Sequence, residues 1–218
     1  MNRPVVYLGP SLPLEEAKGI LDADYRPPVK RGDLKKVEDE GIRTVAIIDG
    51  VFLQSCSVGH REILHIINSG IKVYGAGSMG ALRAAELHHY GMIGVGRIFE
   101  MYSQGEIEGD DEVALVFDPE TLEPLSEPLV NTRFLLNGAV KDGIISNEDA
   151  KTLLDQFRSI YYPRRTMAAF KDLARNFDRS EASTGLTRYI ETKYRDIKKE
   201  DAIALLNALK ELRKIPDL

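Results

Sequence analysis

The chain has 218 residues, with 29 lysines and arginines against 34 aspartates and glutamates, a formal net charge of -5 and one cysteine, Cys56. A single cysteine can form neither an internal disulfide nor a cysteine-based zinc site, which excludes secreted disulfide scaffolds and structural zinc modules and indicates a reducing compartment. The acidic balance supplies no overall basic field for nucleic acid, and the sequence shows neither a signal-peptide core nor an apolar stretch near the ~18 residues that span a bilayer, so we expect a cytoplasmic protein without nucleic-acid or membrane partners.

Short apolar runs alternate with helical patterns in the first half of the chain. In chain order, the pattern predicts a strand at residues 5–8, a helix at 14–21, a helix capped by Asp33 and ended by Gly41, a strand at 44–48, a helix capped by Ser57 and ended by Gly70, a strand at 71–74, and an alanine-rich helix at 81–89. This alternation is typical of βαβ units. We therefore predict an α/β fold with a mostly parallel sheet and flanking helices in the N-terminal half.

The second half has a different character. Residues 113–117 and 122–129 are predicted as two strands around a turn at 118–120, and the signals are helical from residue 131 onward. Ser146 begins a helix-capping sequence, and the last helix has apolar residues at spacings of three, at Ile203, Leu206, Leu209 and Leu212. We expect an α/β core over residues 1–130 and a helical region over residues 131–218 packed on it.

The most informative stretch is residues 73–86, where a strand ends in glycines, followed by Ser78 and a helix. Glycines stand on both sides of this serine, at Gly75, Gly77 and Gly80. They permit sharp turns and close backbone approach, and open α/β sheets hold ligands at the carboxyl ends of their strands. We expect the backbone N–H groups of Met79 and Gly80 to be free at the helix N-terminus, where they can bind an anion or a developing oxyanion.

Three interpretations of this stretch remain open. The glycines match the GxGxxG pattern of dinucleotide-binding folds, but no acidic residue ends a following strand about twenty residues further on, as the ribose contact requires. A nucleophile elbow is the second, although Ala76 stands where the first glycine of GxSxG belongs. The third is a structural glycine turn with Ser78 as an N-cap.

A nucleophilic serine needs a base, because its hydroxyl is not ionised at neutral pH. His88 and His89 lie roughly 15 Å along the helix from Ser78, too far to activate it directly. A lysine that burial keeps neutral can also be the base. Lys72 sits at the far end of its strand, whereas Lys30, on a loop after the first βα unit, is freer to reach the sheet edge. The competing interpretation of Lys30 is a solvated loop lysine.

Several other polar residues have two interpretations each. Asp49 ends a strand at the same edge and either orients a cation or the base, or caps the next turn. The carboxylates at 110–112 either hold a divalent ion or form a solvated turn, and Arg83 pairs with Glu86 on one helix face. Cys56 is either a reactive thiol or a small buried hydrophobe.

Five strings of this sequence resemble the TfuA family. They are GAGSMGALRAAE (75–86), GMIGVGRIFE (91–100), DDEVA (110–114), IIDGVF (47–52) and HREIL (60–64), within a resemblance that covers roughly residues 27–132. Such proteins act with YcaO enzymes in peptide backbone thioamidation, including the glycine thioamide of methyl-coenzyme M reductase. The resemblance implies that YcaO activates the amide with ATP, while the TfuA-like protein hydrolyses the thiocarboxylate of a ThiS-like sulfur carrier. We expect no cofactor and no metal for this chain.

The family is described as having a hydrolase-like Ser-Lys pair, whose serine corresponds to Ser78. The position of the lysine is either Lys30 or Arg61. At Arg61 this chain reads HREIL where many relatives read HKEIL, and an arginine cannot readily act as a base. The other candidate binding residues lie in or beside the same strings: Gly77, Met79, Gly80, Asp49, His60 and Arg83. The alternative function is a non-catalytic adaptor that docks the sulfur carrier and the peptide substrate onto YcaO.

Overall fold

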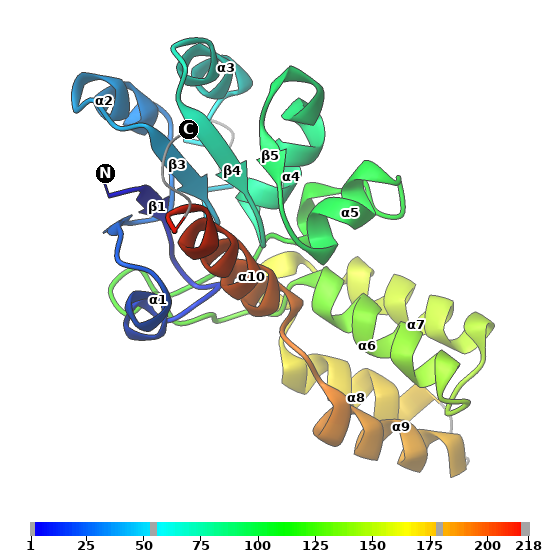
Figure 1. Ribbon diagram of the computed structural model, residues 1–218. Coiled ribbons are helices and arrows are strands. Elements are labelled where there is room, and N and C mark those ends of the chain that lie inside the picture. Colours follow the sequence, from blue (N-terminus) through cyan, green and yellow to red (C-terminus); the bar gives the residue numbers. More distant parts are fainter. Residues whose placement is uncertain (1–2, 53–55, 178–180, 215–218) are drawn as a thin grey trace. The chain divides into compact units, whose positions relative to one another are not determined.

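The structure is a computed structural model that describes residues 3–52, 56–177 and 181–214 (Figure 1). Two units can be distinguished. An α/β unit comprises Met1–Glu108 and Lys198–Leu218, and a helical unit comprises Gly109–Ile197. The sequence predicts a division near residue 130 with everything beyond it in the helical region, whereas the structure divides at Glu108 and returns the last helix to the α/β unit.

One five-stranded parallel sheet is the centre of the α/β unit. Its strands are β1 (Val5–Tyr7), β2 (Asp24–Arg26), β3 (Thr44–Ile47), β4 (Lys72–Gly75) and β5 (Ile93–Gly94). They lie in the order β2-β1-β3-β4-β5, and every neighbouring pair is parallel. The predicted α/β class is confirmed, and so are the three predicted strands. Sequence patterning missed the two edge strands, β2 and β5, because both are short and carry little apolar alternation.

Helices cover both faces of this sheet. They are α1 (Leu14–Ile20), α2 (Asp33–Asp39), α3 (His60–Asn68), α4 (Met79–Leu87), α5 (Arg97–Ser103) and α10 (Ile197–Leu212), with a short 3-10 turn η1 (His88–Tyr90) after α4. Alternate strand residues point to opposite faces. Val45 and Ile47 join α2, α3 and α4 in one buried cluster, while Ala46 and Ile48 join α1 and α10 in another. None of the described helices is long and apolar enough to cross a bilayer.

The last helix, α10, lies across the sheet in Figure 1. Its fully buried face consists of Ala202, Leu205, Leu206 and Leu209. These positions follow the i, i+3, i+4, i+7 spacing of one helix face. The predicted spacing of three includes Leu212, which is wrong, since that side chain is 47% exposed.

The helical unit holds α6 (Leu129–Lys141), α7 (Asn147–Ser159), α8 (Met167–Phe177) and α9 (Glu181–Lys193), with 3-10 turns η2 (Asp110–Glu112) and η3 (Tyr162–Arg164). Its core includes Leu153, Phe157 and Phe170, and the two phenylalanine rings meet edge to face with centroids 5.1 Å apart. Ser146 caps α7 as predicted, because its side chain accepts the Asp149 N–H at 3.1 Å.

The two strands predicted within 113–129 do not form. Only an isolated bridge joins Phe117 to Pro124. Proline has no N–H to donate to a ladder, and the Asp118 carboxylate instead closes a tight turn by accepting the N–H groups of Glu120 and Thr121 at 2.8 and 2.9 Å. These hydrogen bonds lower the pKa of Asp118.

Two predicted helix caps are also wrong. The residue before α2 is Gly32, and the Asp33 carboxylate accepts the N–H of Lys30 at 3.0 Å instead. Before α3 the cap position is taken by Gly59, while the Ser57 hydroxyl donates to the Val51 carbonyl at 2.7 Å.

Candidate active site at the carboxyl edge of the sheet

The carboxyl ends of β1, β3 and β4 bring three polar loops to one edge of the sheet. Ser11 follows β1, Asp49 follows β3 and Ser78 follows β4, and each of these residues is only 2% exposed. The strand order reverses between β1 and β3, since the chain moves from β1 outward to β2 and then returns to β3 on the other side. Ligands of open α/β sheets bind beside such a reversal.

Asp49 orders the loop that follows β1. Its carboxylate accepts the N–H of Gly9 at 2.9 Å, the N–H of Ser11 at 3.1 Å and the Ser11 hydroxyl at 2.6 Å. With three donors on its two oxygens, Asp49 cross-links the ends of β1 and β3. Of the two interpretations drawn from the sequence, the structure favours the one in which this carboxylate caps a turn, although the turn belongs to a different loop.

The three glycines beside Ser78 are required by contacts within the protein. A Cβ on Gly75 would lie 2.1 Å from the Gly80 carbonyl oxygen, and a Cβ on Gly80 would lie 1.7 Å from the Ile47 carbonyl oxygen. Gly77 has a φ of +70°, and its Cβ position lies 3.1 Å from the Lys198 carbonyl oxygen. The GxGxxG spacing therefore fixes the turn against β3 and α10, which argues against the dinucleotide interpretation.

Ser78 occupies the residue before α4, but its side chain makes no capping hydrogen bond. Its own N–H donates to the Ala76 carbonyl at 2.8 Å. Ser78 therefore stands at the N-cap position, but helix capping does not account for its having a hydroxyl side chain.

Of the two backbone N–H groups predicted to bind an oxyanion, one already donates a hydrogen bond within the protein. The Gly80 N–H donates to the Ile48 carbonyl at 3.2 Å, so the prediction that it is free is wrong. Its close approach to β3 imposes that bond. The Met79 N–H has no hydrogen bond to any other residue that the structure describes.

Lys30 reaches the expected edge of the sheet but stays in solvent. Its loop runs beside the end of β3, where Val29 and Gly50 form a parallel bridge, and Gly50 in turn packs against the Met79 side chain. The Lys30 side chain is exposed. The burial that would keep a lysine neutral is therefore missing at this position.

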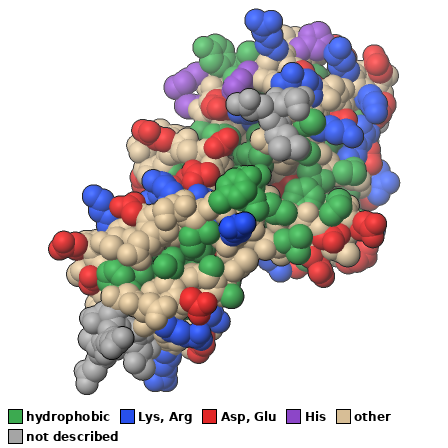
Figure 2. Space-filling model, turned by 180° about the vertical axis from the view of Figure 1, so that it is seen from behind, with side chains coloured by type: hydrophobic (Ala, Val, Ile, Leu, Met, Phe, Trp, Pro, Cys, Tyr) green, Lys and Arg blue, Asp and Glu red, His purple; other side chains and the backbone are tan. Residues whose placement is uncertain are grey.

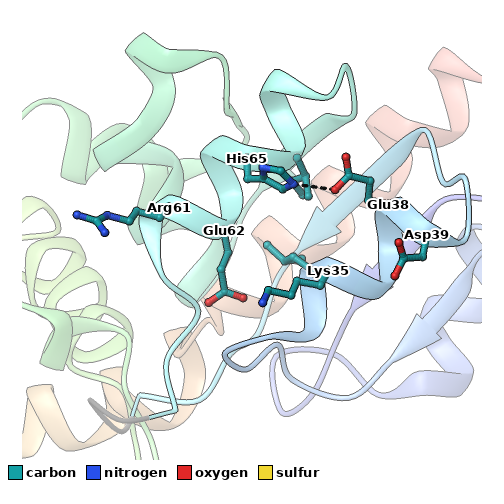
Figure 3. Close-up of a pocket in the computed structure, with 8 residues that line it drawn as sticks. Lys35, Glu38, Asp39, Arg61, Glu62 and His65 are labelled. Atoms are coloured by element: carbon teal, nitrogen blue, oxygen red, sulfur yellow. Dashed lines mark hydrogen bonds and ion pairs between the residues drawn. The ribbon is translucent and has the colours of Figure 1, made fainter.

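Arg61 lies on the first turn of α3, in a different part of the α/β unit from the glycine turn. It lines an open pocket of about 510 Å³ between α2 and α3, with Leu34, Lys35, Glu38, Asp39, Glu62, His65 and Ile66 (Figure 3). Ser78 does not line this pocket, and the Arg61 side chain points away from the other labelled residues in Figure 3. Two of the carboxylates there already have partners within the protein, since Glu62 accepts the N–H of Gly32 and Glu38 binds His65 at 2.8 Å.

His60 and Arg83 belong to a cluster that joins α3 to α4. His60 Nε2 lies 2.8 Å from Glu86 Oε2, and Arg83 Nη1 donates to the same oxygen at 2.6 Å. Arg83 Nε also donates to the Val58 carbonyl at 3.2 Å. The predicted Arg83–Glu86 pair is confirmed, and its contacts give both candidate residues a role in holding helices together. Figure 2 shows histidine side chains, in purple, gathered on one part of the surface, and no group of metal-binding residues occurs among the described side chains.

Two carboxylates of the acidic run at 110–112 form ion pairs with arginine side chains. Glu112 is fully buried and accepts hydrogen bonds from Arg133 and Arg158, each at 2.5 Å at its closest, while Asp111 pairs with Arg165 at 3.0 Å. Neither interpretation drawn from the sequence, a divalent ion or a solvated turn, describes this arrangement. A carboxylate that two guanidinium groups share stabilises the helical unit.

Sequence reasoning missed two buried charged residues at the start of α10, Lys198 and Asp201, which are 2% and 4% exposed. Lys198 packs its backbone on Gly77, directly beside Ser78. Asp201 accepts the N–H groups of Arg97 and Ile98, each at 2.8 Å, and thereby caps α5. In the sequence Lys198 opens a charged run that ends at Asp201, and its one signal is the spacing of four and seven residues that places it on one helix face with Ala202 and Leu205.

Comparison with known families agrees with these observations. The family model described as TfuA-like protein matches residues 49–166 of the chain. The chain belongs to the TfuA-like family. The matched region of this TfuA-like protein contains Asp49, Arg61 and the whole glycine turn with Ser78, whereas Lys30 and Lys198 lie outside it. No curated protein matches the chain significantly.

Proposed function

We propose that this TfuA-like protein hydrolyses the thiocarboxylate of a ThiS-like sulfur carrier and so releases sulfide for peptide backbone thioamidation by a YcaO enzyme. Family membership supports the YcaO-associated role. The observation that carries the hydrolytic step is Ser78 in a glycine turn at the end of β4, with a buried lysine, Lys198, packed on the same turn. The modified substrate that we propose is the glycine of methyl-coenzyme M reductase.

Ser78 is the proposed nucleophile. Its oxygen attacks the thiocarboxylate carbon while its proton passes to a neutral lysine amine. The C–S bond then breaks, sulfur leaves as hydrosulfide with the proton returned by the lysine, and the carrier stays on Ser78 as an ester. Water hydrolyses this ester, which regenerates the serine and leaves the carrier with an ordinary carboxylate. The Met79 N–H is the backbone donor proposed for the oxyanion.

Lys198 is a better candidate for the base than Lys30 or Arg61. An amine can take a proton only when it is uncharged, and removal from water disfavours the charged form of lysine. Lys198 is 2% exposed and begins beside Gly77, whereas Lys30 and Arg61 are both exposed. The side chain of a lysine is long enough to span from that backbone position to the neighbouring residue.

One observation favours the alternative function, a non-catalytic adaptor that docks the carrier and the peptide substrate onto YcaO. Ser78 is only 2% exposed, so hydrolysis requires the residues that cover it to move when the carrier binds. An adaptor needs no such movement, because it uses the surface of the turn and not the serine hydroxyl.

Mass spectrometry of the carrier distinguishes the two functions. Thiocarboxylated carrier is incubated with the protein alone, without YcaO, and the conversion of thiocarboxylate to carboxylate is followed with time. The hydrolase proposal expects conversion by the wild-type protein and about a 100-fold or greater loss in Ser78→Ala and Lys198→Met. Lys30→Ala and Arg61→Ala should retain the wild-type rate.

Ser126→Ala is a matched control, because Ser126 is another buried serine and lies in the helical unit. An adaptor leaves the thiocarboxylate intact in every case. Hydrolysis that persists in Ser78→Ala would remove the serine mechanism.

A further inference from the structure

Asp201 links the start of α10 to the start of α5 through its carboxylate. Its two carboxylate oxygens accept two neighbouring backbone N–H groups, Oδ1 from Arg97 and Oδ2 from Ile98, each at 2.8 Å. Gly96, which precedes them, has a φ of +97°, and a Cβ there would lie 2.3 Å from Asp201 Cγ. The backbone at Gly96, just before α5, therefore lies so close to the Asp201 carboxylate that a side chain at this position would clash with it.

The same helix turn carries Lys198. Residues three apart on an α-helix lie on one face, so Lys198 and Asp201 are neighbours on α10. The Lys198 carbonyl packs on Gly77 and the Asp201 carboxylate packs on Gly96. The first turn of α10 is thus held at two points, one beside Ser78 and one at the start of α5.

This carboxylate is costly to keep ionised. The pKa of Asp201 is raised to about 6, chiefly because the carboxylate is buried; the N–H groups of Ile98 and Arg97 oppose this shift, and the negative charges of Glu100 and Glu200 add to it. The cost of removing a carboxylate from water offsets much of what its hydrogen bonds contribute to stability. The two matched hydrogen bonds therefore account for an aspartate at this position better than a contribution to stability at neutral pH does.

We propose that Asp201 is a positioning residue that fixes the first turn of α10, and with it Lys198, over the Gly77–Ser78 turn. The inference rests on the proposed hydrolase function, because Asp201 would position the proposed base, Lys198, relative to the proposed nucleophile, Ser78. Protonation of Asp201 would put an O–H opposite one of the two N–H donors and break one of the two hydrogen bonds. The ionised form is therefore the one that holds α10 in place.

The test measures kcat and KM for thiocarboxylate hydrolysis in Asp201→Ala and Asp201→Asn, with thermal unfolding of each variant. A base displaced by about 1 Å can lower the rate by up to about 100-fold, so we expect kcat to fall about 10- to 100-fold in Asp201→Ala while KM changes little. Asp201→Asn should fall between this variant and the wild type, because its amide oxygen still accepts one N–H. The control is Asp149→Ala, which removes a capping carboxylate from α7 and should leave kcat unchanged.

The pH profile of the wild-type protein supplies a readout that needs no variant. When both a deprotonated lysine and an ionised Asp201 are required, log kcat falls with a slope of about two per pH unit below pH ~6, and a slope of about one is expected in Asp201→Asn. A wild-type slope of one, or a folded Asp201→Ala with wild-type kcat, would overturn the positioning role. If Ser78→Ala is inactive in the same assay, the hydrolase proposal survives that failure; if Ser78→Ala is active, the hydrolase proposal itself fails.

Discussion

Substitution of Gly80 by alanine should strongly destabilise the α/β unit. The added Cβ would lie 1.7 Å from the Ile47 carbonyl oxygen, and ordinary contacts begin at 3.4 Å, so the backbones of α4 and β3 must separate by roughly 1.7 Å. Neither group can yield by a change of rotamer, because the clash involves the backbone of a central strand.

The magnitude follows from the contacts that this separation breaks. The Ile47 carbonyl accepts the Ala76 N–H at 3.1 Å, and the Gly80 N–H donates to Ile48 at 3.2 Å. Each hydrogen bond contributes about 1 kcal/mol net, and overpacking of a filled core costs a further ~1–3 kcal/mol. We expect Gly80→Ala to lower the free energy of unfolding by about 3–5 kcal/mol.

Urea unfolding followed by circular dichroism measures this loss. The matched control is Gly19→Ala in α1, where nothing lies within 4 Å of the added Cβ, and alanine should stabilise that helix by about 0.5–1 kcal/mol. A loss below about 1 kcal/mol for Gly80→Ala would refute the packing explanation of the glycine turn.

Three further predictions concern charge and sulfur. Because the pKa of Asp201 is raised to about 6 from 3.8, its contribution to stability is greatest below pH ~4 and is lost as the pH rises through 6. The shift corresponds to a loss of about 2–3 kcal/mol in the free energy of unfolding. In Asp201→Asn, urea unfolding measured across this pH range should no longer show that loss. Glu112→Gln should lower the stability of the helical unit by about 3 kcal/mol, because Arg133 and Arg158 lose their shared carboxylate; a thermal midpoint equal to that of the wild type would contradict this. Cys56→Ser should release sulfide at the wild-type rate, since the proposed route keeps sulfur on the carrier, and loss of release by a folded variant would instead indicate a persulfide route.

Local patterning was sufficient for the framework of the α/β unit. Apolar runs identified β1, β3 and β4, and the glycines placed Ser78 at the junction of β4 and α4. It failed where a tertiary partner decides the outcome. The Gly80 N–H was expected to be free as part of a helix N-terminus, but the same glycine that permits a turn also permits β3 to approach and take that donor.

The sequence by itself determined that this is an α/β protein of the TfuA-like family with a serine in a glycine turn, because strand period, turn chemistry and motif strings are all local properties. Only the tertiary structure decided which charged residues share the edge of the sheet with that serine. Lys30 and Arg61 lie close to the motifs along the chain but remain in solvent. Lys198 and Asp201 come from the far end of the chain and become buried, because the apolar face of α10 packs on the same face of the sheet as α1 and brings its first turn onto Gly77 and Gly96.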